Sequence, residues 1–175
     1  DITALAGIDL DLPPGQHVAL MGANGSGKTS LVRCINGLLL PSSGSVTVDG
    51  LSPRQPQDLI QIRQQVGMVF QNPDDQLVTT SVETEIAFGL ENNGVPSELM
   101  RQRVEEMLVA FSLDRYRHTP PHLLSGGERQ RLAIAAAVAL KPTYLLLDEP
   151  TALLDPVSRQ ELVLLIRQLC ADEGV

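Results

Sequence analysis

The chain has 175 residues, which is enough for one domain with its own hydrophobic core. Its 13 basic and 21 acidic residues give a formal net charge of −8. This balance disfavours a nucleic-acid groove, because such a groove needs clustered Lys and Arg. The longest unbroken apolar run, 132–140, has nine residues, whereas a membrane-spanning helix needs about 20. The totals therefore predict one globular domain that neither crosses a bilayer nor binds nucleic acid.

The first elements in chain order predict an antiparallel β arm. Residues 4–12 alternate between apolar and polar side chains, the Pro-Pro-Gly at 13–15 predicts a turn, and 17–21 form a short apolar run. Residues 44–50 also alternate with a period of two and end on Asp-Gly, which is typical of a hairpin. We therefore expect strand, turn and strand over 5–21, followed later by a further hairpin arm.

Beyond this arm, the pattern alternates between helices and buried strands. Apolar residues at helical spacing, with Ser125 as a helix cap and Pro142 as a stop, predict helices, and short apolar runs predict strands. Such alternation is typical of an α/β fold with a parallel sheet. The predicted helices are 29–38, 82–91, 97–111, 125–140 and 156–170, and the predicted strands are 65–70 and 143–148, the latter buried on both faces.

The segment GANGSGKT at 22–29, here called the phosphate loop, matches G-x-x-x-x-G-K-[ST] between a predicted strand and a predicted helix. Glycines let the backbone curl around a triphosphate with its N–H groups pointing inward, and the helix N-terminus adds partial positive charge. Lys28 is expected to reach the β- and γ-phosphates, and Thr29 to place its hydroxyl on Mg²⁺. The complete pattern in this context disfavours the competing interpretation, a chance glycine-rich turn.

The segment YLLLDEP at 144–150 predicts the second half of the same site. Apolar strand residues are followed there by Asp148 and Glu149. A buried strand that delivers a carboxylate at its carboxyl end suits a Mg²⁺ ligand, which predicts this role for Asp148. Neighbouring strand residues alternate, so Glu149 points elsewhere and is expected to orient or deprotonate the attacking water. The alternative interpretation is a solvated acidic strand end.

With these residues assembled, the chain resembles the nucleotide-binding domain of ATP-binding cassette (ABC) ATPases. Four motifs appear in the family's order: GANGSGKT at 22–29, Gln71 after GMVF, LSGGERQ at 124–130, and LLLDEP followed by TALLD at 145–155. The resemblance covers essentially the whole chain. It implies an α/β P-loop NTPase core with a mostly parallel sheet, an N-terminal antiparallel β arm and an inserted helical subdomain, with ATP and Mg²⁺ as cofactors.

The resemblance also implies a role for each site residue. Two such domains pack head to tail, so that each ATP lies between the phosphate loop of one and the LSGG segment of the other. Gln71 would contact Mg²⁺ and the attacking water, and Asp155 would reach across the dimer. The implied catalytic residues are Glu149, Gln71 and Lys28, and the implied Mg²⁺ ligands are Thr29, Gln71 and Asp148. The implied nucleotide-binding residues are Gly22, Ala23, Asn24, Gly25, Ser26, Gly27, Lys28, Thr29, Ser30, Ser125, Gly126, Gly127, Glu128 and Asp155.

The chemistry of the LSGG segment fits this role. Gly126 and Gly127 let backbone N–H groups approach a γ-phosphate, Ser125 adds a hydroxyl, and the helix that they open offers its dipole. The alternative, a bare helix cap, needs Ser125 but not two following glycines, because glycine lowers helix stability.

A narrower resemblance concerns VFQNPDDQLVTTSVETEIAFG at 69–89, which is similar to the ATPases of energy-coupling-factor transporters. These import vitamins or transition-metal ions such as cobalt and nickel. The similarity implies an ATP-hydrolysing peripheral subunit at the cytoplasmic face of the cell membrane. Its partners would be a second ABC ATPase subunit, identical or related, and transmembrane subunits, without nucleic acid. A non-transport ABC ATPase and a non-hydrolysing nucleotide-binding regulatory subunit stay open as alternatives.

The chain departs from the family pattern in two respects. The family stacks adenine on an aromatic residue upstream of the phosphate loop, whereas the first aromatic residue here is Phe70. The family's switch histidine follows one further strand, whereas no histidine follows His122. We therefore expect 1–175 to be a single ABC ATPase domain that is truncated at both ends. Its core is expected over 1–71 and 141–175, and the helical subdomain with the LSGG segment over 72–140.

Two features allow more than one interpretation. Arg129 and Arg131 either help at a dimer interface or are solvated. The apolar stripe of the two helices within 82–111 predicts core packing, with a smaller share available for a groove that receives a membrane subunit beside Gln71. The stripe consists of Val82, Ile86, Phe88, Leu90, Val104, Leu108 and Phe111.

Overall fold

The computed structural model describes residues 3–13, 15–152 and 154–173, without the side chains of 169–173. Contacts between residues divide the chain into two compact units, which we call unit 1 (Asp1–Arg63) and unit 2 (Gln64–Val175). The phosphate loop belongs to unit 1, and the remaining predicted site residues belong to unit 2.

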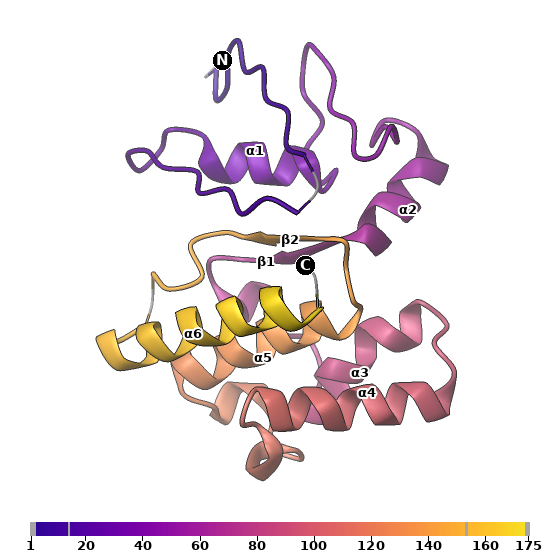
Figure 1. Cartoon of the computed structure of the whole chain (residues 1–175), viewed down its shortest axis with the longest axis vertical. Coiled ribbons are helices and arrows are strands. Elements are labelled where there is room, and N and C mark those ends of the chain that lie inside the picture. Colours follow the sequence, from indigo (N-terminus) through magenta and orange to yellow (C-terminus); the bar gives the residue numbers. More distant parts are fainter. Residues whose placement is uncertain (1–2, 14, 153, 174–175) are drawn as a thin grey trace. The chain divides into compact units, whose positions relative to one another are not determined.

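Unit 1 contains α1 (Lys28–Ile35) and most of α2 (Pro56–Gln65) (Figure 1). The first helix begins within one residue of its predicted start. The second was not predicted from the sequence. Its start signals are a proline at the first helical position and Asp58 in the first turn, whose carboxylate accepts the Ser52 N–H at 3.0 Å. Only Ile62 of this helix is buried, so its apolar pattern is too weak to predict it.

The antiparallel arm predicted over 5–21 is wrong for the residues that the structure describes. They contain no strand, and apolar side chains such as Leu10 and Leu20 are exposed. A strand needs a neighbouring segment to satisfy its backbone hydrogen bonds, and no described segment pairs with this one. The turn predicted at 13–15 includes Pro14, which lies outside the described residues.

The hairpin predicted over 44–50 is also wrong in extent. It reduces to one antiparallel pairing between Val48 and Leu51, whose backbone groups exchange two hydrogen bonds of 2.9 Å. The Asp-Gly turn forms as expected, but no described ladder extends from it.

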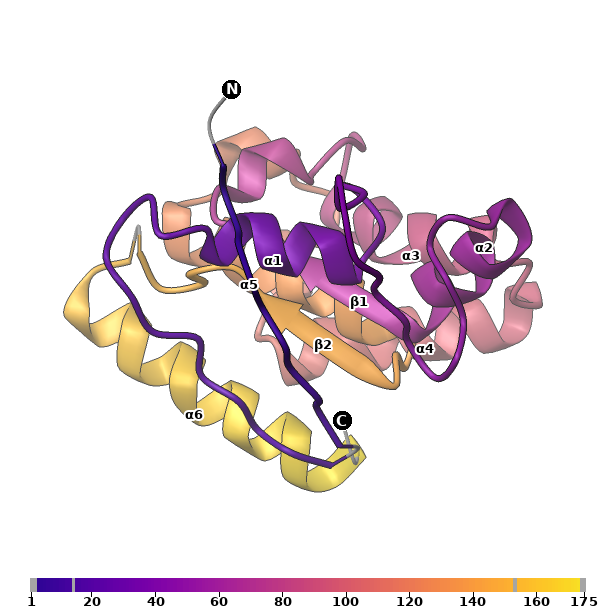
Figure 2. The ribbon, with the colours of Figure 1, turned by 90° about the horizontal axis from the view of Figure 1, so that it is seen from above.

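Unit 2 has a parallel sheet formed by β1 (Val66–Val69) and β2 (Tyr144–Leu147), which lie side by side in Figures 1 and 2. Their parallel pairing confirms the predicted α/β class. β1 is buried throughout, whereas β2 is half-buried. The predicted burial of the second strand on both faces is therefore wrong, because α5 (Gly126–Ala139) packs over β1 more than over β2.

The helices of unit 2 lie close to their predicted bounds. α3 (Val82–Asn92) and α4 (Ser97–Ala110) pack on α5, which in turn packs on β1 (Figure 2). α6 (Pro156–Glu173) adds Leu162 to the same core. Short 3₁₀ turns are η1 (Pro73–Asp75), η2 (Asp114–Tyr116) and η3 (Pro121–Leu123).

The start of α3 is fixed by side chains that bind backbone groups. Ser81 accepts the N–H of Thr84 at 3.3 Å, and the Thr84 hydroxyl oxygen accepts the N–H of Ser81 at 3.1 Å. One turn on, the buried Glu85 carboxylate accepts the N–H groups of Val78 at 2.9 Å and Thr79 at 2.7 Å. These bonds hold the segment that leads from Gln71 into the helix.

The apolar stripe packs in the core, as predicted, with one exception. Phe88 is 46% exposed, so it is available to a partner, whereas the other residues of the stripe lie in the cluster around α5. Its buried members are Val82, Ile86, Leu90, Val104, Leu108 and Phe111.

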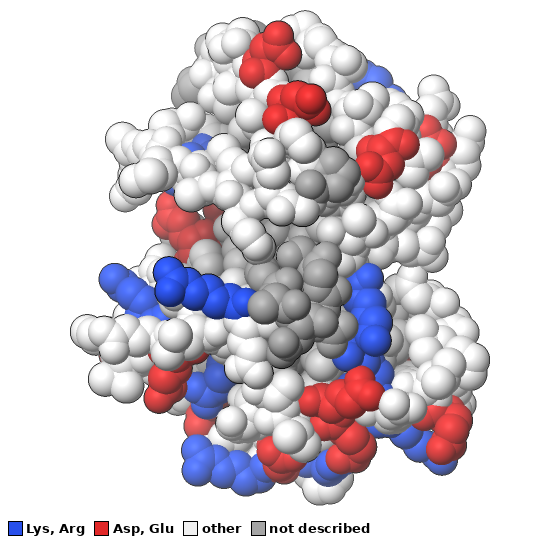
Figure 3. Space-filling view, viewed as in Figure 1, with Lys and Arg blue, Asp and Glu red and all other residues white. Residues whose placement is uncertain are grey.

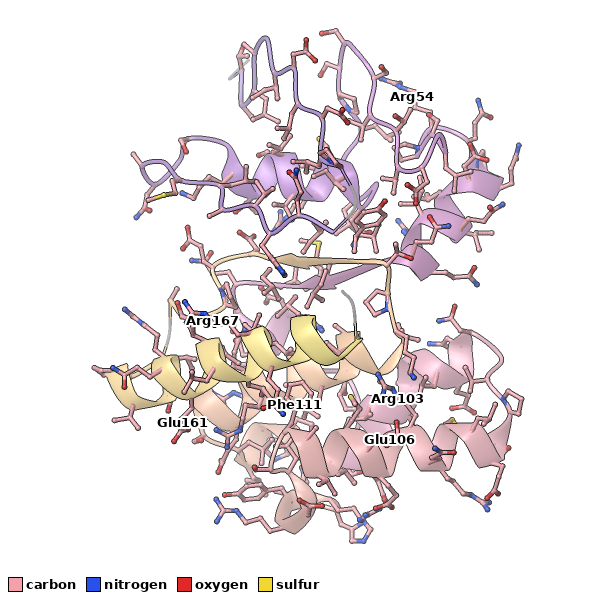
Figure 4. All side chains as sticks on the ribbon, in the orientation of Figure 1. Arg54, Arg103, Glu106, Phe111, Glu161 and Arg167 are labelled. Atoms are coloured by element: carbon pink, nitrogen blue, oxygen red, sulfur yellow. The ribbon has the colours of Figure 1, made fainter. Side chains whose placement is uncertain are left out.

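Arg103 of α4 joins that helix to the end of α5 (Figure 4). It is 7% exposed, and its guanidinium donates to the carbonyls of Val138 and Ala139, both at 3.1 Å. A third nitrogen donates to Glu106 at 3.0 Å. The last carbonyls of α5 are thereby satisfied by a charged donor rather than by water.

On the face shown in Figure 3, acidic and basic side chains lie beside one another. Within unit 2, Arg117 and Glu105 form an ion pair at 2.6 Å. Within the described part of the chain, no helix is long and apolar enough to cross a membrane. Within the predicted subdomain 72–140, α5 packs on β1, and α3 and α4 pack on α5. The expected boundaries of that subdomain stay predictions.

Candidate functional site

The phosphate loop of unit 1 is tightly curved. Gly25 and Gly27 have φ angles of +79° and +92°, which residues with a Cβ rarely adopt. A Cβ on Gly22 would lie 2.7 Å from Oγ of Ser26, and the Ser26 N–H donates to the Ala23 carbonyl at 3.2 Å. The spacing of the glycines therefore follows from the curvature that the loop adopts.

Lys28 turns back over its own loop. Its Nζ donates to the carbonyl oxygens of Gly22 at 3.0 Å and Ala23 at 3.2 Å. An anion bound within the loop would therefore meet this ammonium group, as the sequence predicts.

The start of α1 suits a negatively charged ligand. Gly27 is the N-cap, no side chain caps the helix there, and the first turn carries no acidic residue. Thr29 and Ser30 lie in the same turn. A helix N-terminus without a side-chain cap presents N–H groups and partial positive charge. The residues present fit the phosphates of a nucleotide, and the Thr29 hydroxyl is of the ligand type that Mg²⁺ accepts.

Within unit 2, Asp148 lies at the carboxyl end of β2. Its N–H donates to the Val69 carbonyl at 3.0 Å, which extends the ladder between the two strands. The residue is 5% exposed. Because a buried carboxylate is favourable only beside donors or a cation, this position fits its predicted role as a Mg²⁺ ligand.

Glu149 follows in a sharp turn. Its φ of +48° is uncommon for a residue with a side chain and costs on the order of 1–3 kcal/mol. The turn closes with a 3.0 Å hydrogen bond from the Ala152 N–H to the Glu149 carbonyl. The side-chain amide of Gln71, which follows β1, donates to Oε2 of Glu149 at 3.0 Å. The structure thus brings the predicted general base and the predicted water-positioning residue together.

The LSGG segment begins α5 with reciprocal capping bonds. Oγ of Ser125 accepts the Glu128 N–H at 3.3 Å, and Oε2 of Glu128 accepts the Ser125 N–H at 2.7 Å. The cap uses the hydroxyl oxygen as an acceptor, and a hydroxyl also carries one proton to donate. Capping by Ser125 is therefore compatible with its predicted contact to a phosphate.

Tyr116 contributes to this helix start, which the sequence did not predict. Its hydroxyl donates to Oε1 of Glu128, and Arg115 lies 3.7 Å from the same oxygen. Burial opposes the charge on Glu128, but hydrogen bonds from Tyr116 and Ser125 outweigh it and lower the pKa of the carboxyl from its ordinary 4.5. The Tyr116 pKa is raised, chiefly by the same hydrogen bond. No sequence motif marks this contact.

The two glycines of the LSGG segment differ in their surroundings. A Cβ on Gly127 would lie 3.1 Å from Oγ of Ser158 in α6, so packing within the chain explains that glycine. A Cβ on Gly126 would meet nothing within 4 Å. Contacts within the described residues therefore account for a glycine at 127 but give no reason for a glycine at 126.

Asp155 caps α6. Its carboxylate accepts the Val157 N–H at 2.9 Å, the Ser158 N–H at 3.1 Å and the Ser158 hydroxyl at 2.5 Å. The hydrogen bonds from Ser158 lower the pKa of Asp155. The carboxylate is thus ordered by its own helix, and its predicted reach across a dimer stays a prediction.

Arg129 and Arg131 form polar contacts with other residues of the same chain. The sequence offered only a dimer interface or solvation for these two side chains. Arg129 donates to the Leu124 carbonyl at 2.6 Å, and its Nε lies 3.1 Å from Asp74. Arg131 lies 3.8 Å from Glu161 of α6. Both side chains are 20–25% exposed, so full solvation is wrong.

Gln71, Asp148 and Glu149 therefore form one group in unit 2, and the phosphate loop forms another in unit 1. Among the described residues, no cluster of three or more His, Cys, Asp or Glu side chains could hold a metal ion. The predicted Mg²⁺ site, with Asp148 as its one carboxylate, stays a prediction.

Comparisons with known sequences agree with the motifs. A family profile described as ABC transporter matches residues 5–152. The energy-coupling factor transporter ATP-binding protein EcfA1 of Symbiobacterium thermophilum is 52% identical over 172 residues, which are 98% of this chain and 60% of that protein. EcfA1 of Caldanaerobacter subterraneus is 47% identical over 98% of the chain and 62% of its own length. The chain thus spans about 60% of the length of these curated relatives.

Two solved structures share the fold. The cbiO1 protein of Clostridium perfringens, described as part of the ABC transporter complex cbiONQ, is 36% identical over 98% of this chain and 69% of its own, with a TM-score of 0.87. The ATP-binding cassette MJ0796, in a dimeric post-hydrolysis state bound to ADP and Pi, is 31% identical over 98% and 76% of the two chains, with a TM-score of 0.86. The fold, the motifs and these relatives agree, and the chain belongs to the ABC transporter family.

Proposed function

We propose that this chain is the ATP-binding and ATP-hydrolysing part of a subunit that powers an energy-coupling-factor importer. Its relatives at 52% and 47% identity are named as ATP-binding proteins of such transporters. Because the chain spans about 60% of their length, its activity, its partners and the class of imported substrate, a metal ion or a vitamin, are parts of this proposal.

The observation that carries the proposal is the hydrogen bond between Gln71 and Glu149. It joins the ends of two parallel strands and lies next to the buried Asp148. A carboxylate that is held by an amide at a strand end can orient a water molecule and take its proton. A non-hydrolysing subunit would not need this arrangement.

The nucleotide-facing roles follow from the chemistry of each group. The N–H groups of the loop and of the first turn of α1 would bind the phosphates, and Lys28 would exchange its carbonyl partners for phosphate oxygens. Thr29, Gln71 and Asp148 would hold Mg²⁺, which when bound neutralises charge on the phosphates. Glu149 would accept the proton of the attacking water.

A second copy or a related subunit would complete the site. Gly126 has open space where a side chain would stand, and it opens a helix whose N-cap, Ser125, is exposed. These features suit the approach of a phosphate that is held by another chain. Ser125, Gly126, Gly127, Glu128 and Asp155 would therefore act on the partner's nucleotide.

Import would follow from opening and closing of this dimer. ATP would close it, and hydrolysis would reopen it, so that transmembrane partners change conformation. Val78, in the segment between Gln71 and α3, and Phe88 of α3 are both exposed and offer apolar side chains to such partners. The subunit would lie at the cytoplasmic face of the cell membrane as a peripheral component.

The decisive experiment measures phosphate release by the full-length protein with Mg-ATP. We expect turnover in the wild type, loss of ATP binding in Lys28→Ala, and retained binding without turnover in Glu149→Gln. Lys141→Ala, in the turn after α5 and outside these motifs, provides the matched control. A wild-type protein that binds ATP but never releases phosphate would favour a non-hydrolysing regulatory subunit instead.

A further inference from the structure

A single side chain joins the strand end before Gln71 to the middle of α5. Oε1 of Gln76 accepts the N–H of Phe70 at 3.2 Å, and its Nε2 donates to the Ala133 carbonyl at 3.0 Å. Ala133 is fully buried, and both hydrogen bonds are partly shielded from water. We call this pair of bonds the Gln76 bridge.

A second contact links the same segment to α5. Oδ1 of Asp74 in η1 lies 3.1 Å from Nε of Arg129, and Arg129 also donates to the Leu124 carbonyl at 2.6 Å. Arg129 and Ala133 are four residues apart, so they lie on one face of the helix, one turn from each other. The segment after Gln71 is therefore attached along that face by two independent polar contacts.

We propose that Gln76 is a positioning residue that sets the place of Gln71 beside Glu149 according to the position of α5. The inference rests on the proposed function and adds a way in which the position of α5 controls the hydrolysis site. The Phe70 amide is the backbone group immediately before Gln71, and Gln71 makes the 3.0 Å contact with Glu149. The helix at the other end of the bridge begins at the LSGG segment. When a nucleotide binds that segment and α5 shifts, the contact between Gln71 and Glu149 would therefore change.

The residue type fits this role. An amide offers an acceptor and a donor on one rigid planar group, and the bridge uses both. A carboxylate could replace the acceptor but not the donor, and a thioether of similar length could replace neither. The competing interpretation is that Gln76 only satisfies two backbone groups near the core. That interpretation predicts a loss of stability without any functional link to Gln71.

The first test compares Gln76→Met with Gln76→Glu in the full-length protein. Gln76→Met removes both bonds at similar volume, whereas Gln76→Glu keeps an acceptor for the Phe70 N–H. We expect kcat for ATP hydrolysis to fall about tenfold in Gln76→Met, with KM for ATP changed less than about twofold and a smaller loss of kcat in Gln76→Glu. An equal kcat in all three proteins would overturn the proposal.

A double-mutant cycle separates positioning from stability. If Gln76 acts through Gln71, then Gln76→Met should cause no further loss of kcat when Gln71 is already alanine. If the two losses multiply, the residues act independently and the proposal is wrong.

Amide hydrogen exchange provides a readout that does not depend on turnover. Exchange at the Phe70 amide should be faster by about tenfold in Gln76→Met and close to wild type in Gln76→Glu, because only the former loses the acceptor. Unchanged exchange in Gln76→Met would contradict the bridge itself. Absence of ATP turnover in the wild type would instead contradict the proposed function, so the two failures can be told apart.

The neighbouring carboxylates of η1 supply a matched pair of controls. Asp74→Asn should lower kcat by about twofold, because the Asp74 carboxylate is 59% exposed and its contact with Arg129 is therefore weak. Asp75 instead contacts Asn72 within its own turn, at 3.5 Å. Asp75→Asn should therefore leave kcat unchanged, and a loss equal to that of Gln76→Met would show that any change in this turn suffices and would overturn the assignment.

Discussion

The side-chain amide of Gln71 donates a 3.0 Å hydrogen bond to the carboxylate of Glu149, although 78 residues separate them in the chain. They meet because β1 and β2 run parallel and therefore end at the same edge. The left-handed backbone of Glu149 then turns the chain away from the strand. The position of each side chain thus depends on the end of a different strand, and a change at either strand end would alter the contact between them.

We predict that Glu149→Gln lowers the rate of ATP hydrolysis by at least ~100-fold, because the amide cannot accept a proton from water. ATP binding should persist, so an ATP-dependent dimer should last longer than in the wild type. Phosphate release and light scattering during gel filtration, both on the full-length protein with Mg-ATP, would measure the two effects. Glu98→Gln, at a fully exposed position of α4, should behave as the wild type. A Glu149→Gln protein that stays monomeric at saturating Mg-ATP would count against the dimer.

Gly126 and Gly127 should respond differently to alanine. Gly126→Ala meets open space and should leave the free energy of unfolding unchanged or raise it by up to ~1 kcal/mol, since alanine favours helix. Gly127→Ala brings a methyl group to 3.1 Å from Ser158 and should be destabilising, by about 1–3 kcal/mol.

Activity should not follow that order of stability. Gly126→Ala should abolish ATP-dependent dimerisation while the protein remains folded, because its methyl group would stand where a phosphate of the partner is expected. Chemical unfolding and ATP hydrolysis, measured on the same samples, would test this. Full activity in Gly126→Ala would mean that no ligand approaches that position.

The capping bonds of α5 predict that the stability of the fold decreases at acidic pH. The pKa of Glu128 is lower in the folded protein than its ordinary value of 4.5, so the ionised carboxylate stabilises the fold when the pH is above 4.5. This stabilisation is lost as the pH falls through the lowered pKa. Between pH 7 and pH 3.5, the wild type should therefore lose more unfolding free energy than Glu128→Gln does. Urea unfolding at several pH values would measure the difference, and Tyr116→Phe should show an intermediate loss. Parallel pH profiles for the wild type and Glu128→Gln would contradict the assignment.

Arg103 should be important for stability and unimportant for nucleotide chemistry. Arg103→Ala would leave two buried carbonyls at the end of α5 without their charged donor, at a cost of about 3 kcal/mol. The Tm of Arg103→Ala should be lower than that of the wild type. The Tm of Arg101→Ala should be unchanged, because the Arg101 side chain is 78% exposed. Equal Tm values for the two variants would indicate that water replaces the guanidinium.

The helices of unit 2 were predictable because their signals are local. Ser125 caps α5 as predicted, Ser81 caps α3 directly before its predicted start, and Pro142 follows the end of α5. The parallel pairing of β1 and β2 could also be expected, since helices separate the two strands in the chain. The arm over 5–21 was not predictable in the same way, because a strand depends on a partner that the segment itself does not specify.

The candidate site divides along the same line. The phosphate loop, Asp148 and Glu149 could be recognised from residue types and spacing, and Gln71, Ser125 and Asp155 from the family resemblance. The contacts of Tyr116 and Gln76 could not be predicted. Each joins elements that are distant in the chain or irregular in conformation, so only the tertiary fold brings the partners within hydrogen-bonding distance.

The contacts of Lys28 with its own loop have a consequence for how a ligand would enter. The ammonium group donates to the carbonyl oxygens of Gly22 and Ala23, and it thereby supports the curvature of the backbone before an anion arrives. A phosphate would displace these carbonyls from an already ordered cation, so that little conformational entropy is lost on binding. The loop is in this sense a preorganised receptor, and a neutral residue at this position would remove both the charge and the shape.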